Sequence, residues 1–306
     1  MSYRWMPIMG RMSKEGGSIV FKGGEISLPG NTAPNAEVGL FICDQYFSGG
    51  SISADITFNG VSQNTSAGII FNYDSQTQNL FLAALGSGPM YAVRHQGSDK
   101  WTSVAHAGPP NAIEECIAYH LEVCLYGSLV IMRVNDVEVI RTIIPIPLLQ
   151  SQVGLFCINK SDIKIDNYLI EIVKPKAFVV MQFSSPYNEV YLDVIKNICE
   201  EEKIDVVRID EASGPGLIID DISKVIRESK LIIADISPVN ANVFYEVGFA
   251  HALNKPTILI AEKGTSLPFD VSPFRTLFYE NSIGGKRKLE EGLRKHIRAS
   301  LRQPFE

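Results

Sequence analysis

The chain has 306 residues, of which 45% are hydrophobic and 20% are charged, and its formal net charge is −6. This composition excludes a mainly disordered chain, and the length predicts two domains. The negative balance leaves no basic surface for a nucleic-acid backbone, and no apolar run reaches the ~18 residues that span a bilayer. We therefore expect neither nucleic acid nor membrane as a partner, and a cytoplasmic location. An odd number of cysteines without CxxC spacing predicts reduced thiols in the core: Cys43, Cys116, Cys124, Cys157 and Cys199.

Residues 1–173 show the period of half-buried antiparallel strands, and turn residues separate the apolar runs. Asn135 and Asp136 join two such runs as a tight hairpin turn, because Asn and Asp tolerate positive φ. Many short strands of this kind predict an all-β sandwich for this domain. Alternating apolar positions occur in residues 52–58, 69–73, 80–84, 119–125 and 153–157.

Residues 174–306 alternate instead between buried strands and helices of amphipathic period. This βαβ series predicts an α/β domain with a doubly wound, parallel, five-stranded sheet, whose ligands bind at the carboxyl ends of the strands. The expected strands are residues 177–183, 206–209, 231–236, 257–261 and 276–279, and the expected helices are residues 188–203, 218–229, 243–253 and 286–301.

The segment from Ala234 to His251 is the richest in functional groups. Asp235 ends the third strand, while Asn242 and Glu246 are four residues apart and share one face of the following helix. Carboxylates and amides in one cleft suit a sugar, because they bind ribose hydroxyls and a glutamate facing the anomeric carbon can stabilise an oxocarbenium-like centre or attack it. Gly248, inside the helix, indicates close packing or ligand approach.

The same residues have a purely structural interpretation. Asp235 then caps a loop, Asn242 is the N-cap of the helix, and Glu246 interacts with the helix dipole. Ser213–Gly216 is a second candidate, for binding an anion, but it lacks the lysine of a Walker loop and is better explained as a plain turn. No His, Cys, Asp and Glu residues have metal-ligand spacing, so no metal is expected.

The run ADISPVNANVFYEVGFAHALNKPTILI, preceded by KAFVVMQFSSPYNEVY, resembles the TIR-like and nucleoside 2-deoxyribosyltransferase-like superfamily. The resemblance implies a flavodoxin-like domain that cleaves N-glycosidic bonds of nucleosides or NAD with a helix-borne glutamate, here Glu246. It places Asp235, Asn240 and Asn242 at ribose-holding positions. The other substrate-binding residues that it implies, most of them in the first-strand exit, are Gln182, Phe183, Ser184, Tyr187, Ser237 and Tyr245.

The N-terminal strands, among them FSGGSISADITF and YHLEVCLYGSLVIMRVNDVEVI, resemble a concanavalin A-like lectin/glucanase jelly roll, which is also seen in laminin-G-like modules. Catalytic members need paired carboxylates, whereas the expectation here is that Asp55, Glu122, Asp166 and Glu171 are isolated, which disfavours a glucanase. Candidates for stacking on a sugar are Tyr73, Tyr91 and Trp101. We expect this domain to sense a glycan or another small ligand, or to assemble a homo-oligomer.

The two resemblances together imply an N-glycosidic bond hydrolase that acts on NAD or a related nucleotide as substrate, without a cofactor. Such a protein is similar to bacterial antiphage effectors with a sensing or oligomerisation domain. Two alternatives remain open. The cleft binds a nucleotide signal without turnover, or the domain is a nucleoside 2-deoxyribosyltransferase.

Overall fold

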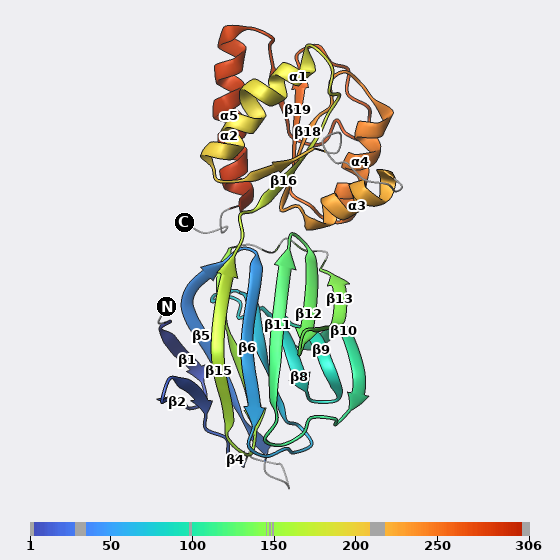
Figure 1. Cartoon of the computed structure of the whole chain (residues 1–306). Coiled ribbons are helices and arrows are strands. Elements are labelled where there is room, and N and C mark those ends of the chain that lie inside the picture. The colour runs from blue at the N-terminus through green and yellow to red at the C-terminus, as the bar shows by residue number, and fades with distance from the viewer. Residues whose placement is uncertain are drawn as a thin grey trace. The chain divides into compact units, whose positions relative to one another are not determined.

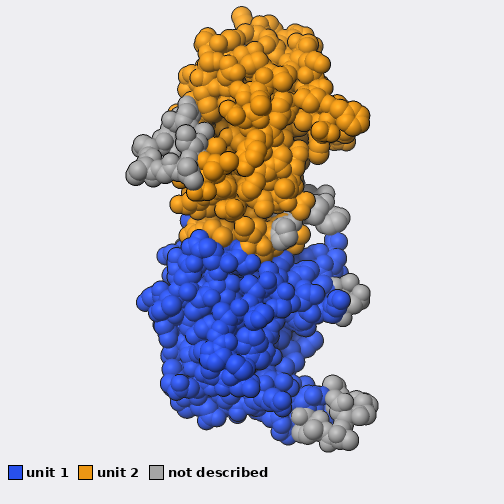
Figure 2. Space-filling view, turned by 90° about the vertical axis from the view of Figure 1, so that its right-hand side faces the viewer, with its two compact units in different colours: residues 1–125, 130–142, 150–173 blue, residues 126–129, 143–149, 174–306 orange. Residues whose placement is uncertain are grey.

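The structure is a computed structural model that describes residues 3–27, 35–97, 100–144, 146, 148, 150–208 and 218–301. The chain divides into two compact units, shown in blue and orange in Figure 2. Unit 1 comprises residues 1–125, 130–142 and 150–173, and unit 2 comprises residues 126–129, 143–149 and 174–306. Among the described helices, none is both long enough and apolar enough to cross a lipid bilayer.

The strands of the N-terminal part form two large antiparallel sheets (Figure 1). Along each strand, successive side chains point to opposite faces of the sheet. The side chains on the inner faces form the core, in which Phe21, Phe41, Phe58 and Phe71 are fully buried. The prediction of an all-β sandwich is confirmed. The eight-stranded sheet has the order β1-β5-β14-β7-β8-β9-β10 with β4 paired to β5: β1 (Trp5–Met9), β4 (Glu25–Ile26), β5 (Asn35–Phe47), β7 (Ser66–Tyr73), β8 (Leu80–Gly86), β9 (Pro89–Gln96), β10 (Trp101–Pro110) and β14 (Ser151–Asn159).

The seven-stranded sheet has the order β13-β12-β11-β6-β15-β3-β2. Its hairpin between β12 and β13 turns at Asn135 and Asp136, whose φ angles are 49° and 64°, as the sequence predicts. The strands are β2 (Met12–Glu15), β3 (Ser18–Phe21), β6 (Gly50–Phe58), β11 (Ala118–Tyr126), β12 (Leu129–Val134), β13 (Val137–Ile143) and β15 (Ile163–Ile172).

Four cysteines are buried free thiols, but Cys116 is exposed, so the expectation of a core thiol is wrong at that position.

The C-terminal part contains a parallel five-stranded sheet with the order β17-β16-β18-β19-β20. The second strand therefore lies outside the first, and the order reverses between β16 and β18. This is an α/β arrangement with a parallel five-stranded sheet, as predicted. The strands are β16 (Lys176–Val180), β17 (Asp205–Val207), β18 (Leu231–Asp235), β19 (Thr257–Glu262) and β20 (Thr276–Tyr279).

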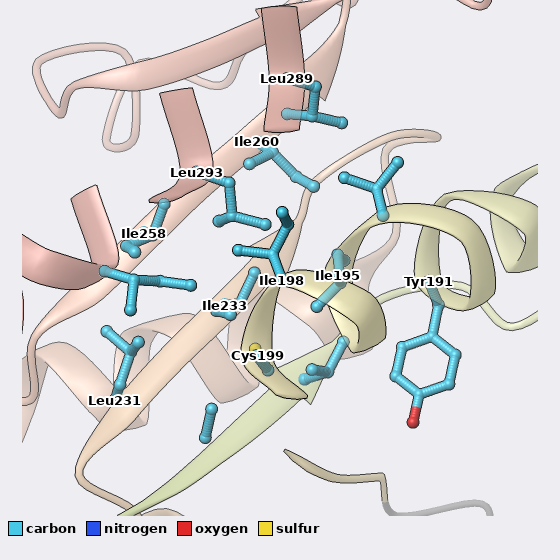
Figure 3. Close-up of a cluster of buried hydrophobic side chains, with 14 of the residues drawn as sticks. Tyr191, Ile195, Ile198, Cys199, Leu231, Ile233, Ile258, Ile260, Leu289 and Leu293 are labelled. Carbon is cyan, nitrogen blue, oxygen red and sulfur yellow. The ribbon is translucent and has the colours of Figure 1, made fainter. Parts of the chain in front are cut away.

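Helices cover both faces of this sheet. One face packs against α1 (Tyr187–Val190), η1 (Tyr191–Ile195), α2 (Lys196–Glu201) and α5 (Ile283–Leu301) in an apolar cluster that includes Ile195, Ile233 and Leu293 (Figure 3). The other face packs against α3 (Ile218–Glu228) and α4 (Ala241–Ala252). The expected helix of residues 188–203 is interrupted by the π-helical turn η1. Because one additional residue per turn rotates the side chains that follow, such turns often occur near functional sites.

Candidate functional site

The candidate site is a cavity of about 680 Å³ at the carboxyl end of β16, beside the first turns of α4. This is the edge of the sheet where the strand order reverses, the usual place for a ligand in an open parallel sheet. The volume lies within the range of small-molecule sites. The cavity is lined by Val179, Val180, Met181, Gln182, Phe183, Ile219, Ile222, Asn240, Asn242, Val243, Tyr245 and Glu246.

Glu246 supplies the only carboxyl group among the described residues that line this cavity. It lies in the second turn of α4 and is 9% exposed. No described residue forms a hydrogen bond or ion pair with its side chain, and burial raises its pKa to about 7. The site therefore holds a carboxyl group that is poised between its neutral and charged forms near neutral pH and is available to a ligand.

The start of α4 brings two amides and an aromatic ring to the same cavity. Asn240 is the N-cap, and its side-chain oxygen accepts a hydrogen bond of 2.9 Å from the backbone N–H of Asn242. The structural interpretation that gave the cap to Asn242 is therefore wrong, and the Asn242 side chain is free of that role. Tyr245 is 54% exposed at the cavity. Gly248 has open space where a side chain would begin, so the expected close packing is absent there.

The first-strand exit contributes two of its four predicted residues. Gln182 and Phe183 line the cavity, whereas Ser184 and Tyr187 are not among the lining residues. The Ser184 hydroxyl accepts a hydrogen bond of 2.9 Å from Nε2 of Gln182, and Tyr187 packs against the apolar cluster beneath α1 and α5. Ser184 thus orients Gln182, while Tyr187 is half-buried against the core.

Asp235 and Ser237 also lie outside the cavity lining, because both are buried in a polar network of their own. Asp235 Oδ1 accepts hydrogen bonds from the backbone N–H and the hydroxyl of Ser237, at 2.9 and 3.0 Å. Its Oδ2 accepts a bond of 2.8 Å from the Tyr279 hydroxyl. Burial raises the pKa of Asp235 to about 6. The carboxyl fixes the loop that leads into α4, which agrees with the loop-capping interpretation.

The apolar side chains that line the cavity, and one arginine beside it, were not predicted from the sequence. Val179, Val180 and Val243 line the cavity from β16 and α4, and the period of a buried strand was the signal for the first two. Arg208 follows β17 directly and is 8% exposed, with its guanidinium stacked on the ring of Phe183. The position of a charged residue at a strand's carboxyl end was a signal that could have been used.

No group of three or more His, Cys, Asp or Glu side chains suited to a metal occurs within the described ranges. His251, which the sequence places near Glu246, stacks on Phe274 with ring centroids 4.4 Å apart. The candidate anion loop Ser213–Gly216 lies outside the described residues.

The sandwich brings together carboxylates that were expected to be isolated. Asp55 and Asp166 lie directly opposite each other on β6 and β15. Asp55 also contacts Nδ1 of His120 at 2.6 Å and accepts a bond of 2.6 Å from Asn167. Glu122 pairs with Arg133 at 2.8 Å. The expectation of isolation is wrong for Asp55 and Asp166, which neighbouring strands of one sheet bring together although the two residues are distant in sequence.

A second cavity, of about 400 Å³, lies among three connections of the sandwich, β6–β7, β8–β9 and β10–β11. The described side chains that line it are uncharged. The lining consists of Val61, Ser62, Gln63, Thr65, Gly86, Ser87, Asn111 and Ile113.

Of the three aromatic residues expected to stack on sugars, Tyr73 is buried in an apolar cluster and Tyr91 is half-buried, while Trp101 is 40% exposed.

No protein-family profile matches this chain, and no curated protein is similar to it in sequence. Solved structures that are similar include the carbohydrate-binding module CBM66 from Bacillus subtilis, with 15% identity over 54% of this chain and 92% of that chain and a TM-score of 0.44. A prokaryotic β-1,3-1,4-glucanase (lichenase) derived from a mouse hindgut metagenome has 9% identity over 53% and 92%, with a TM-score of 0.37. A Bacillus licheniformis β-glucanase has 9% identity over 55% and 92%, with a TM-score of 0.38.

Proposed function

We propose that the C-terminal part of the chain hydrolyses the N-glycosidic bond of NAD or a related nucleotide at the cavity beside α4. The observation that carries the proposal is the Glu246 carboxyl, which lines this cavity, is nearly buried and has no hydrogen-bond partner among the described residues. A carboxyl group in this state costs stability, so that a role toward a ligand explains it better than a role in the fold.

In this reaction the C–N bond breaks while positive charge develops on the ribose ring, and the ionised carboxylate of Glu246 stabilises that charge. The electron pair of the bond leaves with the base, the oxygen of a water molecule adds to the anomeric carbon, and the water releases a proton. With NAD the products are nicotinamide and ADP-ribose. Asn242 and Asn240 offer amide groups to ribose hydroxyls, and Phe183 and Tyr245 offer ring surfaces to the base.

The test is to incubate the pure full chain, at low and high concentration, with NAD and a nucleoside panel and to separate the products by chromatography. Glu246→Gln should lower turnover by at least about 1,000-fold and should leave NAD affinity largely intact. The matched control is Glu200→Gln, an exposed glutamate on α2 of the same unit. Wild-type inactivity toward the whole panel, or an active Glu246→Gln protein, contradicts the proposal.

Two alternatives have distinct outcomes in the same assay. A module that only binds a nucleotide signal shows affinity without products, and its affinity is unchanged in Glu246→Gln. A nucleoside 2-deoxyribosyltransferase forms a new nucleoside when a second free base is added. An effector of the antiphage type, in which the sandwich promotes homo-oligomerisation, should gain specific activity as its concentration rises.

For the sandwich we propose a neutral glycan as ligand, because its cavity offers hydroxyl and amide groups and no charged side chain among the described residues. Ser87 and Asn111 at this cavity have φ angles of 62° and 55°, a conformation that costs a non-glycine residue energy and is often found at binding sites. Calorimetric titration with neutral and acidic mono- and disaccharides tests this. Binding of neutral sugars that Asn111→Ala weakens supports it, and absence of binding contradicts it.

A further inference from the structure

Arg208 occupies an unusual place for a permanently charged side chain. It follows the edge strand β17 directly and is 8% exposed. Burying a guanidinium is costly unless fixed partners compensate for the lost water. Its contacts with the described residues therefore indicate one thing that its burial achieves.

The guanidinium lies in the corner formed by two aromatic rings and contacts both. Its central carbon lies 4.0 Å from the ring centroid of Phe183 and 4.3 Å from that of Tyr191. The two rings are almost perpendicular to each other, with centroids 6.3 Å apart. Nη1 of Arg208 also donates a hydrogen bond of 3.3 Å to Oδ1 of Asn188. One rigid planar group thus contacts three residues of a short segment that follows β16.

Two of these contacts anchor the guanidinium, and the third reaches the cavity. Tyr191 is 3% exposed and belongs to the apolar cluster of Figure 3, so it is a fixed support. Asn188 lies on α1. Phe183 is half-buried, lies beyond the last residue of β16 and lines the cavity. Its ring is therefore outside the hydrogen-bonded sheet, where side-chain contacts must define its orientation.

We propose that Arg208 is a positioning residue, which holds the ring of Phe183 as a preformed flat wall of the cavity. The proposal rests on the proposed function of this cavity, because the wall acts on the base of a bound nucleotide. Arg208 itself is not among the lining residues. A lysine in its place keeps the charge but has no planar guanidinium to contact both rings, and a methionine keeps only the apolar stem.

The first test needs no ligand. The chain is labelled with ¹³C in its phenylalanine rings, and the Phe183 signals are assigned with Phe183→Leu. In both Arg208→Lys and Arg208→Met, the chemical shifts of the Phe183 ring should move toward those of an unconstrained phenylalanine. The matched control is Arg298→Met, which removes an arginine that pairs with Glu202, the C-cap of α2 in the same unit. Unchanged Phe183 signals in both Arg208 variants overturn the proposal, and so does an equal movement in the control.

The second test uses NAD hydrolysis by the full chain. We expect Arg208→Met and Phe183→Leu each to raise KM by about 10-fold with kcat within about twofold, because a disordered wall weakens binding without removing Glu246. The double variant should be no worse than either single variant, since both remove the same ordered ring. Independent effects, about 100-fold in the double variant, overturn the proposal. If the wild-type chain does not hydrolyse NAD, the proposed function fails while the NMR test still decides the role of Arg208.

Discussion

Replacing Glu246 with glutamine should make the folded protein more stable at alkaline pH and leave its stability unchanged at acidic pH. Burial raises the pKa of this carboxyl from 4.5 to about 7. Between these values the folded state holds a proton that the unfolded chain has released, so the free energy of unfolding falls as pH rises from about 4.5 to 7. Glutamine keeps the shape of the neutral carboxyl and removes this loss.

The size of the effect follows from the shift. Each pKa unit corresponds to about 1.4 kcal/mol, which gives an upper value of about 3 kcal/mol for Glu246 above pH 7. Because the cavity admits water to part of the carboxyl, we expect about 2 kcal/mol at pH 8. For a unit of this size that difference corresponds to a rise of about 5–10 °C in the melting temperature. At pH 4 the carboxyl is protonated in the folded state and mostly protonated in the unfolded chain, so the expected difference is close to zero.

The two units can be followed separately in the full chain. Trp5 and Trp101, the two tryptophans of the sequence, lie in unit 1, so their fluorescence reports on the sandwich. All described helices belong to residues 187–301, so circular dichroism at 222 nm reports mainly on unit 2. The glutamine variant should shift the circular dichroism transition at pH 8 and leave the fluorescence transition in place. The control, Glu200→Gln, should change neither.

Two results would refute this reasoning. An equal shift at pH 4 and pH 8 would mean that glutamine changes packing or helix propensity and that proton binding is irrelevant. Destabilisation at pH 8 would mean that the ionised carboxylate has a favourable partner in the folded protein.

Three further outcomes are expected. The value of kcat/KM for NAD should rise with pH through an apparent pKa near 7, because the ionised form of Glu246 stabilises the developing charge. A value that falls with pH over that range would assign an acid role to the carboxyl. Tyr279→Phe should lower the free energy of unfolding by about 1–3 kcal/mol at pH 8 and by less at pH 5. The reason is that the buried Asp235 carboxylate loses the hydrogen bond from the Tyr279 hydroxyl, which lowers the pKa of Asp235. Calorimetry at both pH values measures the difference. Residues 174–306 expressed alone should unfold cooperatively, because both apolar clusters of the α/β sheet consist of residues from Ala177 onward; a protease-sensitive fragment would contradict this.

Sequence period was sufficient for most elements of the α/β part. The expected strand of residues 276–279 has the same bounds in the structure, and the expected helix of residues 243–253 begins two residues earlier, at Ala241, directly after the cap Asn240. The long strand β5 was less visible. Its sequence does not alternate cleanly, because side chains on both faces of its central part are buried, among them Phe41 and Ile42.

Some residues of the candidate site could be placed from the sequence, and others could not. Asn242 and Glu246 follow from helix period alone, since positions four apart share a face. The direction in which Asp235 points does not, because it depends on Tyr279, 44 residues later and on another strand. The contacts of Arg208 likewise depend on two rings that only the tertiary structure brings close to it.

Asp235 and Glu246 show why a raised pKa alone does not locate a site. Burial raises the pKa of both carboxyls, to about 6 and about 7. Asp235 is already bonded by three donors from Ser237 and Tyr279, so a ligand could recruit it only by breaking the loop that leads into α4. Glu246 has no such bonds among the described residues and lines a cavity that also holds three side-chain amides and two aromatic rings. The ionised carboxylate of Glu246 therefore gains a favourable electrostatic partner only when a positively charged centre forms beside it. A group that gains its partner at that stage stabilises a transition state more strongly than a ground state.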